Sequence, residues 1–322
     1  MITEIEKNFY RITLRMPYRL RHVNAYLFAQ DGKLALFDTG LNTPGSYETL
    51  QRDLAGIDFG LQDIQHIYLT HVHTDHCSMA GLLQNASGAK VHLSRAAFAE
   101  YRHFRESDPA VTQLRKFYAR HGMSSHFIDL IVEEYEDIRG IITEFHADFF
   151  LCDGDHYEFG NWKFKTVETP GHAAGHVCFF FPEKGFLLAG DHILPYIAPI
   201  LSPNIFDNHF HPLSTYLNSL NAVEKLPVTT IYPGHGNSFV DCNERLFDIR
   251  QYHQKRKLAV LDHVNKQPKT TYEISQEMVG PNLSEFDKFL ALNEILTYLK
   301  ELTAEGLIQE DLSGNILVYV RM

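Results

Sequence analysis

Residues 71–76 read His-Val-His-Thr-Asp-His, which places four side chains capable of binding a metal within six positions. A largely apolar run at 66–70 precedes this stretch and predicts a buried strand, whereas Ser-Met-Ala-Gly-Leu-Leu at 78–83 predicts the start of a helix. The four side chains are therefore crowded into the point where a strand ends and a helix begins.

The spacing within this stretch predicts two adjacent groups of ligands. Alternate residues of an extended chain point to the same side, so His71 and His73 share a face. The turn into the helix lets Asp75 and His76 reach a second, neighbouring position. Nitrogen and oxygen ligands arranged in this way suit two metal ions side by side. The alternative is a polar loop in a chain that has 19 histidines, but matching residues downstream favour the metal site.

Three of these downstream residues, His172, Asp191 and His235, each follow a short run that predicts a strand. Glycines flank each one, as expected where the backbone turns tightly near an ion or a substrate. Asp38 ends an earlier predicted strand near the same edge. It is either an outer carboxylate that orients a metal ligand or a turn or N-cap aspartate, and spacing alone favours neither interpretation.

The composition indicates a globular protein with a substantial core. The chain has 322 residues, of which 44% are hydrophobic, so it is long enough for one domain and an appendage. Its net charge of −11 argues against nucleic acid as the main partner. We expect a cytoplasmic protein without a membrane segment, because the N-terminus lacks a signal-peptide pattern and the four scattered cysteines form no C-x-x-C pair.

The order of predicted elements indicates a strand-rich domain with helical additions. We predict a catalytic domain over 1–242, interrupted by a helical insertion at about 95–145, and a small winged-helix-like domain over 243–322. The insertion is rich in aromatic residues, which are interpreted as packing residues that can also line an apolar pocket. The C-terminal part combines two long predicted helices with a predicted hairpin at 306–320.

The motifs resemble those of the metallo-β-lactamase-fold hydrolases. The similarity rests on the stretch at 71–76, Thr-Pro-Gly-His at 169–172, Ala-Gly-Asp at 189–191 and Pro-Gly-His-Gly at 233–236, with Asp-Thr-Gly at 38–40 as a first motif. The set is most similar to the glyoxalase II and lactonase-like branch. The resemblance implies an α/β (α+β) fold, an αββα sandwich with the metal site at one edge between two sheets.

The resemblance also implies a ligand set. One metal is expected on His71, His73 and His172, the second on Asp75, His76 and His235, and Asp191 is expected to bridge them. Two Zn²⁺ ions per chain are the expected cofactors, with Fe or Mn as other occupants of such a donor set. His176, the second histidine of the Gly-His-x-x-Gly-His pattern, is expected to be structural.

The implied chemistry is hydrolysis of an ester-type bond by a metal-bridging hydroxide, with Asp75 accepting a proton and Asp191 holding both ions. The expected substrate is a small molecule, either a thioester such as an acyl-glutathione or acyl-CoA, or a lactone. The main alternative is a metal-dependent nuclease, since endoribonuclease-like members carry the same motifs and a winged-helix tail. A non-enzymatic effector on this fold is disfavoured because all seven ligands are present.

Three further residues are candidate substrate contacts. Tyr196 lies five positions after Asp191, and His209 and His211 fall between two ligand motifs. The apolar residues of the helix predicted at 285–302 require a partner surface, either on the catalytic domain or on a second subunit in a homodimer. We expect this tail and the insertion at about 95–145 to form the two walls of the substrate pocket.

Overall fold

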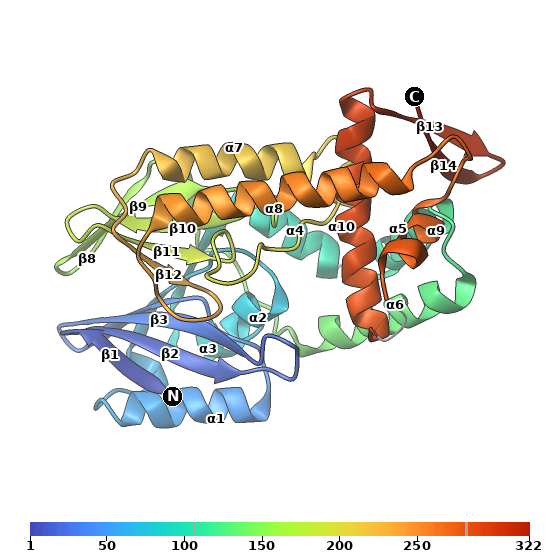
Figure 1. The fold of residues 1–322 in the computed structure, drawn as a ribbon. Helices are drawn as coiled ribbons and strands as arrows, with labels where there is room; N and C mark the ends of the chain where they lie inside the picture. Colours follow the sequence, from blue (N-terminus) through green and yellow to red (C-terminus); the bar gives the residue numbers. More distant parts are fainter. Residues whose placement is uncertain (106, 281–282) are drawn as a thin grey trace.

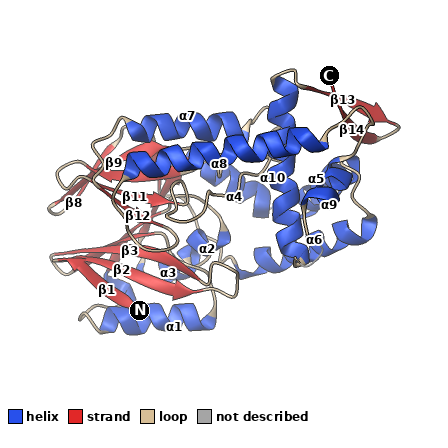
Figure 2. Ribbon diagram, in the orientation of Figure 1, coloured by secondary structure: helices blue, strands red, loops and turns tan. Residues whose placement is uncertain are grey.

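The computed structural model describes residues 1–105, 107–280 and 283–322. Its centre is a pair of facing β-sheets (Figures 1 and 2). The first sheet has seven strands in the order β1-β2-β3-β4-β5-β6-β7, antiparallel from β1 to β4 and parallel from β4 to β7. The bounds of these strands are β1 (Ile2–Glu6), β2 (Phe9–Arg15), β3 (His22–Gln30), β4 (Lys33–Phe37), β5 (Ile64–Tyr68), β6 (Lys90–Ser94) and β7 (Phe149–Leu151).

The second sheet has five strands in the order β12-β11-β10-β9-β8. Strands β8 to β11 pair antiparallel, and β11 pairs parallel with β12. Their bounds are β8 (His156–Phe159), β9 (Trp162–Glu168), β10 (Val177–Phe181), β11 (Phe186–Gly190) and β12 (Thr230–Pro233).

Aromatic side chains fill the space between the two sheets. Phe28 and Phe37 of the first sheet contact Phe181 of the second, with the rings of Phe28 and Phe181 stacked at 5.0 Å. All three side chains are buried, as are most of their neighbours in this cluster. Burial of large rings on both inner faces removes apolar area from water and holds the sheets together.

Helices cover the outer face of each sheet. In Figure 1, α1 (Pro44–Ala55) lies below the first sheet, and α7 (Pro212–Glu224) and α8 (Cys242–His263) lie above the second. The short 3₁₀ helix η1 (Leu61–Asp63) and α3 (Ala80–Ser87) share a buried cluster with α1, and α2 (Thr74–Cys77) contributes Cys77 to it. The predicted αββα sandwich is therefore confirmed.

The predicted insertion and tail form the helical end of the molecule. The insertion comprises α4 (Arg95–Arg105), α5 (Ser107–Arg120) and α6 (Ser125–Ile141), and position 106 of that prediction lies outside the described residues. The tail comprises α9 (Thr271–Met278), α10 (Glu285–Ala304) and the hairpin of β13 (Ile308–Ser313) and β14 (Ile316–Arg321), and positions 281 and 282 of the predicted tail domain are likewise not described.

The tail packs against the rest of the chain through α8 and α10. Leu292 and Leu296 of α10 share a buried cluster with Phe127 of α6, and the Tyr118 hydroxyl donates to the Asn293 side chain over 2.8 Å. The predicted boundary at 242/243 falls at the start of α8, which shares a second cluster with α7 and the second sheet. The division into two domains and the winged-helix assignment remain predictions.

Strand β1 and the short helices η1 and α2 were not predicted from the sequence. Strand β1 pairs with β2 at the sheet edge, but its sequence has no clear alternation that would predict it. The helix start predicted at 78–83 corresponds to α3, and the separate short helix α2, which ends at Cys77, precedes it. In the described part of the chain, we find no helix with the length and apolar character needed to cross a membrane.

Candidate metal centre

The ends of strands from both sheets bring the seven predicted ligands to one edge of the sandwich. Strand β5 leads into His71 and His73, and the short helix α2 carries Asp75 and His76. The remaining three come from the second sheet and follow β9, β11 and β12, respectively: His172, Asp191 and His235. The seven residues fall into overlapping groups whose ligand atoms lie within 4.8 Å of one another.

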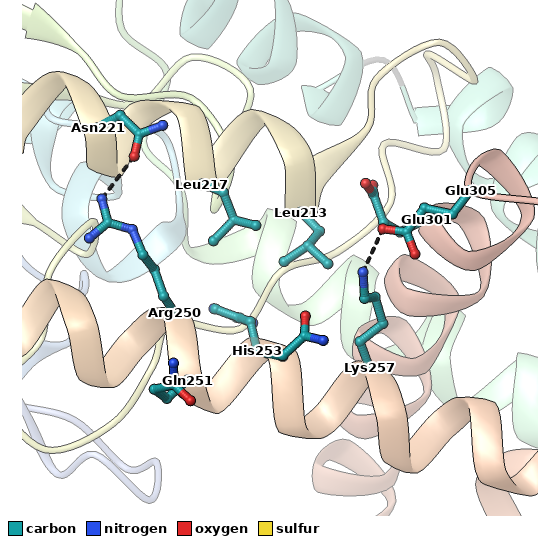
Figure 3. A pocket seen from close by; sticks show the side chains of 10 residues that line it. Leu213, Leu217, Asn221, Arg250, Gln251, His253, Lys257, Glu301 and Glu305 are labelled. Atoms are coloured by element: carbon teal, nitrogen blue, oxygen red, sulfur yellow. Dashed lines mark hydrogen bonds and ion pairs between the residues drawn. The ribbon is translucent and has the colours of Figure 1, made fainter. Parts of the chain in front are cut away.

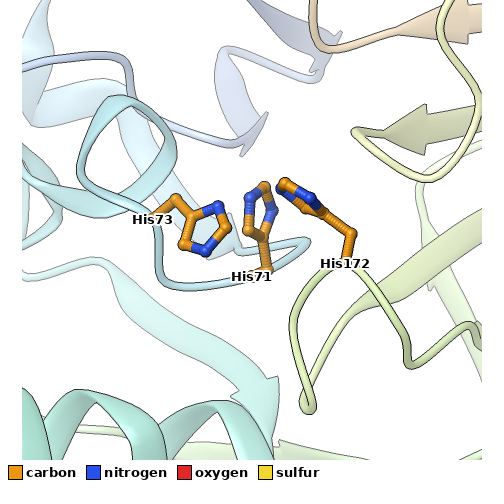
Figure 4. A group of neighbouring side chains, drawn as sticks. All are labelled: His71, His73 and His172. Atoms are coloured by element: carbon orange, nitrogen blue, oxygen red, sulfur yellow. The ribbon is translucent and has the colours of Figure 1, made fainter. Parts of the chain in front are cut away.

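The first group consists of His71, His73 and His172 (Figure 4). The ring centroids lie 4.6 Å apart for His71 and His73 and 4.5 Å apart for His73 and His172. His71 is fully buried, whereas His73 is exposed. Three imidazoles that converge from two loops, with one open to solvent, could hold a cation that a substrate can approach.

The second group consists of Asp75, His76 and His235, and Asp191 lies between it and the first. The Oδ2 atom of Asp191 is 3.3 Å from Nε2 of His235 and 3.7 Å from Nε2 of His172. Its Oδ1 atom is 3.4 Å from Nε2 of His76. The carboxylate thus faces histidines of both groups, which is the position that a bridging ligand requires.

Hydrogen bonds to Nδ1 orient the histidine rings. His71, His172 and His235 use Nδ1 to contact Thr70 Oγ1 at 2.9 Å, the Ile200 carbonyl at 2.8 Å and the His22 carbonyl at 2.7 Å. The opposite Nε2 atoms of these three rings and of His76 are buried and have no hydrogen-bond partner among the described residues. Four orphaned imidazole nitrogens and two carboxylates form a donor set that fits divalent cations such as Zn²⁺.

Asp38 orients the remaining buried histidine of this set. Its carboxylate lies 2.8 Å from His76 Nδ1 and accepts hydrogen bonds of 2.8 Å from both the backbone N–H and the hydroxyl of Thr70. The backbone of Asp38 has a φ of +59°, a left-handed conformation that aspartate tolerates better than most residues. The helix that follows is capped by Thr43. These contacts match the outer-carboxylate interpretation of Asp38.

The surroundings shift the histidine pKa values in opposite directions, lowering that of His71 and raising that of His235. Burial and the neighbouring imidazoles of His76 and His73 hold the pKa of His71 well below its usual value, so this ring is neutral and ready to coordinate. Burial also lowers the pKa of His235, but Asp191 and Asp75 outweigh it and raise that pKa to about 10. A cation that binds beside His235 therefore competes with a proton.

His176 supports the site from behind, as predicted. Its Nδ1 lies 2.8 Å from the Thr169 hydroxyl, and its Nε2 accepts from the backbone N–H of Asp191 over 3.2 Å. Gly190 has a φ of +48°, and a Cβ at this position would lie 2.7 Å from the His176 ring. A side chain here would displace His176, so glycine is required beside Asp191.

Several residues that position the ligand loops were not predicted from the sequence. The hydroxyl of buried Tyr216 on α7 donates to the His192 carbonyl over 2.7 Å, next to Asp191. A Cβ at Gly171 would lie 2.4 Å from the Cβ of the same tyrosine, so its side chain also packs against the His172 loop. Glu100 of α4 accepts hydrogen bonds from the backbone N–H groups that follow His172, those of Ala174 and Gly175, both over 3.1 Å.

The three candidate substrate contacts occupy different surroundings. Tyr196 is 77% exposed, and its ring lies 3.8 Å from where a Cβ on Gly236 would stand, beside His235. His209 is exposed on a loop, where its backbone N–H donates to the Asp207 carboxylate, and His211 precedes α7 as its N-cap. A substrate role for each remains a prediction.

A separate cavity of about 420 Å³ lies among α7, α8 and α10 (Figure 3). Its two basic side chains are paired, since Arg250 contacts Asn221 and Lys257 contacts Glu305. The lining residues include none of the seven ligand residues. This cavity is therefore not the metal centre.

Comparisons with known proteins agree with this geometry. A family model described as "Metallo-beta-lactamase superfamily" matches residues 18–235. The chain is 27% identical to the "Probable metallo-hydrolase YqjP" of Bacillus subtilis, with 97% of each chain covered. It is 24% identical to "Thioesterase pkgB" of Emericella nidulans over 76% of this chain and 55% of that protein.

A solved structure extends the likeness to the whole chain. It is the metallo-beta-lactamase family protein TTHA1429 from Thermus thermophilus, which is 29% identical. The match covers 99% of this chain and 100% of that one, with a TM-score of 0.88. The likeness therefore includes the helical end of the molecule as well as the sandwich.

Proposed function

The chain belongs to the metallo-β-lactamase superfamily and is a metal-dependent hydrolase; on that premise, we propose that it is a dinuclear zinc enzyme that cleaves thioesters. The proposal includes acyl-CoA and acyl-glutathione as substrates, and lactones as a related class of ester-type bond. We also propose that it belongs with the glyoxalase II and lactonase-like branch, because Asp191 stands where cysteine-ligand β-lactamases carry a cysteine.

One observation carries the dinuclear proposal. Four buried imidazole Nε2 atoms have no hydrogen-bond partner among the described residues and face two carboxylates, with Asp191 between the two groups. Unpartnered polar atoms in a buried site cost free energy, and a pair of cations would satisfy them. We assign His71, His73 and His172 to one ion and Asp75, His76 and His235 to the other.

Divalent cations held by these side chains would supply an activated water molecule and would polarise the substrate carbonyl. In the hydrolysis, the water oxygen bonds to the acyl carbon, the carbon–sulfur bond breaks, and the thiol leaves with a proton. Asp75 is suited to move that proton, because its carboxylate is partly exposed and lies 3.2 Å from Nε2 of His235. Asp38 and Tyr216 hold His76 and the Asp191 turn, respectively, in place.

Partly exposed ring pairs that involve the turn between β2 and β3 and the loop after Asp191 support an acyl substrate. The ring of Tyr18, in the turn between β2 and β3, stacks on Phe286 of α10 with centroids 5.8 Å apart. On the loop that follows Asp191, Phe206 stacks at 4.9 Å on His103 of α4. These pairs support the proposal that the insertion and the winged-helix-like tail form the pocket walls. The thioesterase name of one relative supports the same substrate class.

The test is a hydrolysis panel with zinc-loaded protein. The substrates are octanoyl-CoA, S-lactoylglutathione, an N-acyl-homoserine lactone and a single-stranded RNA. We expect thioester hydrolysis that chelation abolishes and added zinc restores. The variant Asp191→Ala should lose it, whereas Asp53→Asn, which changes a buried carboxylate away from the site, should retain it. RNA cleavage without thioester or lactone hydrolysis would replace this proposal with the nuclease alternative.

A further inference from the structure

The turn between β2 and β3 carries an unusual concentration of positive charge. Residues 15–21 read Arg-Met-Pro-Tyr-Arg-Leu-Arg, with three arginines and no acidic residue, in a chain that has 40 acidic and 29 basic residues. Arg15, Arg19 and Arg21 are all exposed. Within the described residues, none of the three forms an ion pair. Their guanidinium groups are therefore available to an anionic ligand.

A second basic stretch, on α8, is arranged differently. On α8, Arg250 contacts an acidic residue of α7, and Arg256 and Lys257 contact acidic residues in the middle and at the end of α10. These contacts use the positive charge of Arg250, Arg256 and Lys257 to join helices. The unpaired arginines of the β2–β3 turn need a different explanation from the paired residues of α8.

This turn is attached directly to the metal centre. The carbonyl of His22, the residue that follows Arg21, accepts the hydrogen bond from His235 Nδ1 over 2.7 Å. The His22 ring in turn accepts from the backbone N–H of Gly236 over 3.3 Å. The turn is closed by the hydrogen bond from Met16 N–H to the Arg21 carbonyl, at 2.8 Å. Arg19 and Arg21 therefore lie on a short, closed turn. The next residue, His22, holds the proposed metal ligand His235 in place.

We propose that Arg19 and Arg21 bind the phosphate groups of a coenzyme A thioester while its acyl carbonyl lies at the metal centre. The inference rests on the proposed function and narrows its substrate class. A guanidinium group binds phosphate through two parallel hydrogen bonds, which makes arginine better suited than lysine to this ligand. The pantetheine arm separates the phosphates from the thioester, so the two ends can occupy the exposed turn and the buried site.

The charge of the turn favours coenzyme A over glutathione. Glutathione carries an ammonium group as well as two carboxylates, and an ammonium group requires an acidic or neutral acceptor. Residues 15–21 offer three cations and no acid. The neighbouring carboxylates of Glu134 and Asp75 act on Tyr18 but form no ion pair with these arginines in the described part of the chain, so the unpaired charge of the turn is positive and suits a carrier whose charges are all negative. The stacked rings of Tyr18 and Phe286 stand beside the arginines and can contact the apolar part of the arm.

The test compares octanoyl-CoA with octanoyl-pantetheine, which has the same thioester and arm but no phosphate. We expect the wild type to favour octanoyl-CoA in kcat/KM by about tenfold or more at low salt, with the preference shrinking as salt rises. In the double variant Arg19→Gln/Arg21→Gln, the KM for octanoyl-CoA should rise by about that factor, whereas hydrolysis of octanoyl-pantetheine should stay within about twofold. The control is Lys255→Gln/Lys266→Gln, which makes the same change in net charge on and after α8 and should behave like the wild type.

The outcomes separate this inference from the proposed function. Equal hydrolysis of the two substrates by the wild type, unchanged in the arginine variant, would overturn the phosphate site and leave the thioesterase proposal intact. The wild type could instead prefer S-lactoylglutathione, and the arginine variant could lose that preference. This result would overturn the coenzyme A inference and assign the turn to glutathione binding. Salt-sensitive RNA binding lost in the variant, without thioester hydrolysis by the wild type, would overturn both proposals.

Discussion

Replacing Asp38 with asparagine should weaken the second metal site without changing any proposed ligand. Asparagine is nearly isosteric and tolerates the φ of +59° at this position, so the backbone is not expected to move. Its amide oxygen can still accept from the Thr70 N–H, but its NH₂ group then faces His76 Nδ1 at the 2.8 Å position. The ring must accept at Nδ1, which places its proton on Nε2, where the metal should bind.

The expected loss of metal affinity can be estimated from the contact between Asp38 and His76. Loss of an outer carboxylate partner lowers metal affinity by about 10- to 100-fold, which corresponds to about 1.4 to 2.7 kcal/mol. We expect the loss at the ion held by Asp75, His76 and His235, with the ion on His71, His73 and His172 affected less. Competition titration against a chromophoric chelator, with elemental analysis of the dialysed protein, measures both sites.

Asp53→Asn is the matched control for this experiment. Asp53 is a buried carboxylate that contacts the N-terminal amine at 2.9 Å and Arg52 at 3.0 Å, so its replacement makes the same chemical change away from the site. The control should bind both ions as the wild type does. Wild-type affinity at both sites in Asp38→Asn would refute the argument that this carboxylate sets the tautomer of His76.

Three further predictions test other parts of the site. Asp191→Ala should be the most damaging single change to metal content, because it removes a ligand from both ions, and two retained ions with full activity would refute the bridging role. Tyr216→Phe should lower the free energy of unfolding by about 1 kcal/mol and weaken metal binding, because it removes the hydrogen bond to the His192 carbonyl; unchanged melting and metal titrations would contradict this. In metal-free protein, a His235 pKa raised from 6.5 to about 10 stabilises the fold below pH 6.5, and the effect is lost as the pH rises towards 10. The difference in Tm between wild type and His235→Gln should therefore shrink over that range, and a constant difference would count against the assignment.

The proposed ligands could be predicted because short stretches of sequence around each of them indicate where it lies in the fold. Each lies where a strand ends and a turn begins, and the hydrophobic pattern with flanking glycines marks those points in the sequence. The sandwich was predicted from the resemblance of these motifs to those of the metallo-β-lactamase-fold hydrolases. Strand β1 was missed because an edge strand with only partial burial lacks a strong alternation.

The residues that support the ligands could not be predicted, because their contacts join distant parts of the chain. His22 and His235 are 213 positions apart, and Glu100 contacts Ala174 across 74 positions. Neither residue type nor spacing marks such a pair before the fold is known. Asp38 was recognised as a candidate, but the choice between orienting a ligand and capping a helix required the contact with His76.

Crystallographic anomalous scattering at the zinc absorption edge would test the central claim most directly. Data from zinc-loaded crystals should give two peaks per chain at this edge of the sandwich, one among His71, His73 and His172 and one among Asp75, His76 and His235. The Asp191 carboxylate should lie between the peaks and contact both. A single peak in zinc-saturated crystals, or a second peak outside these side chains, would contradict the dinuclear account.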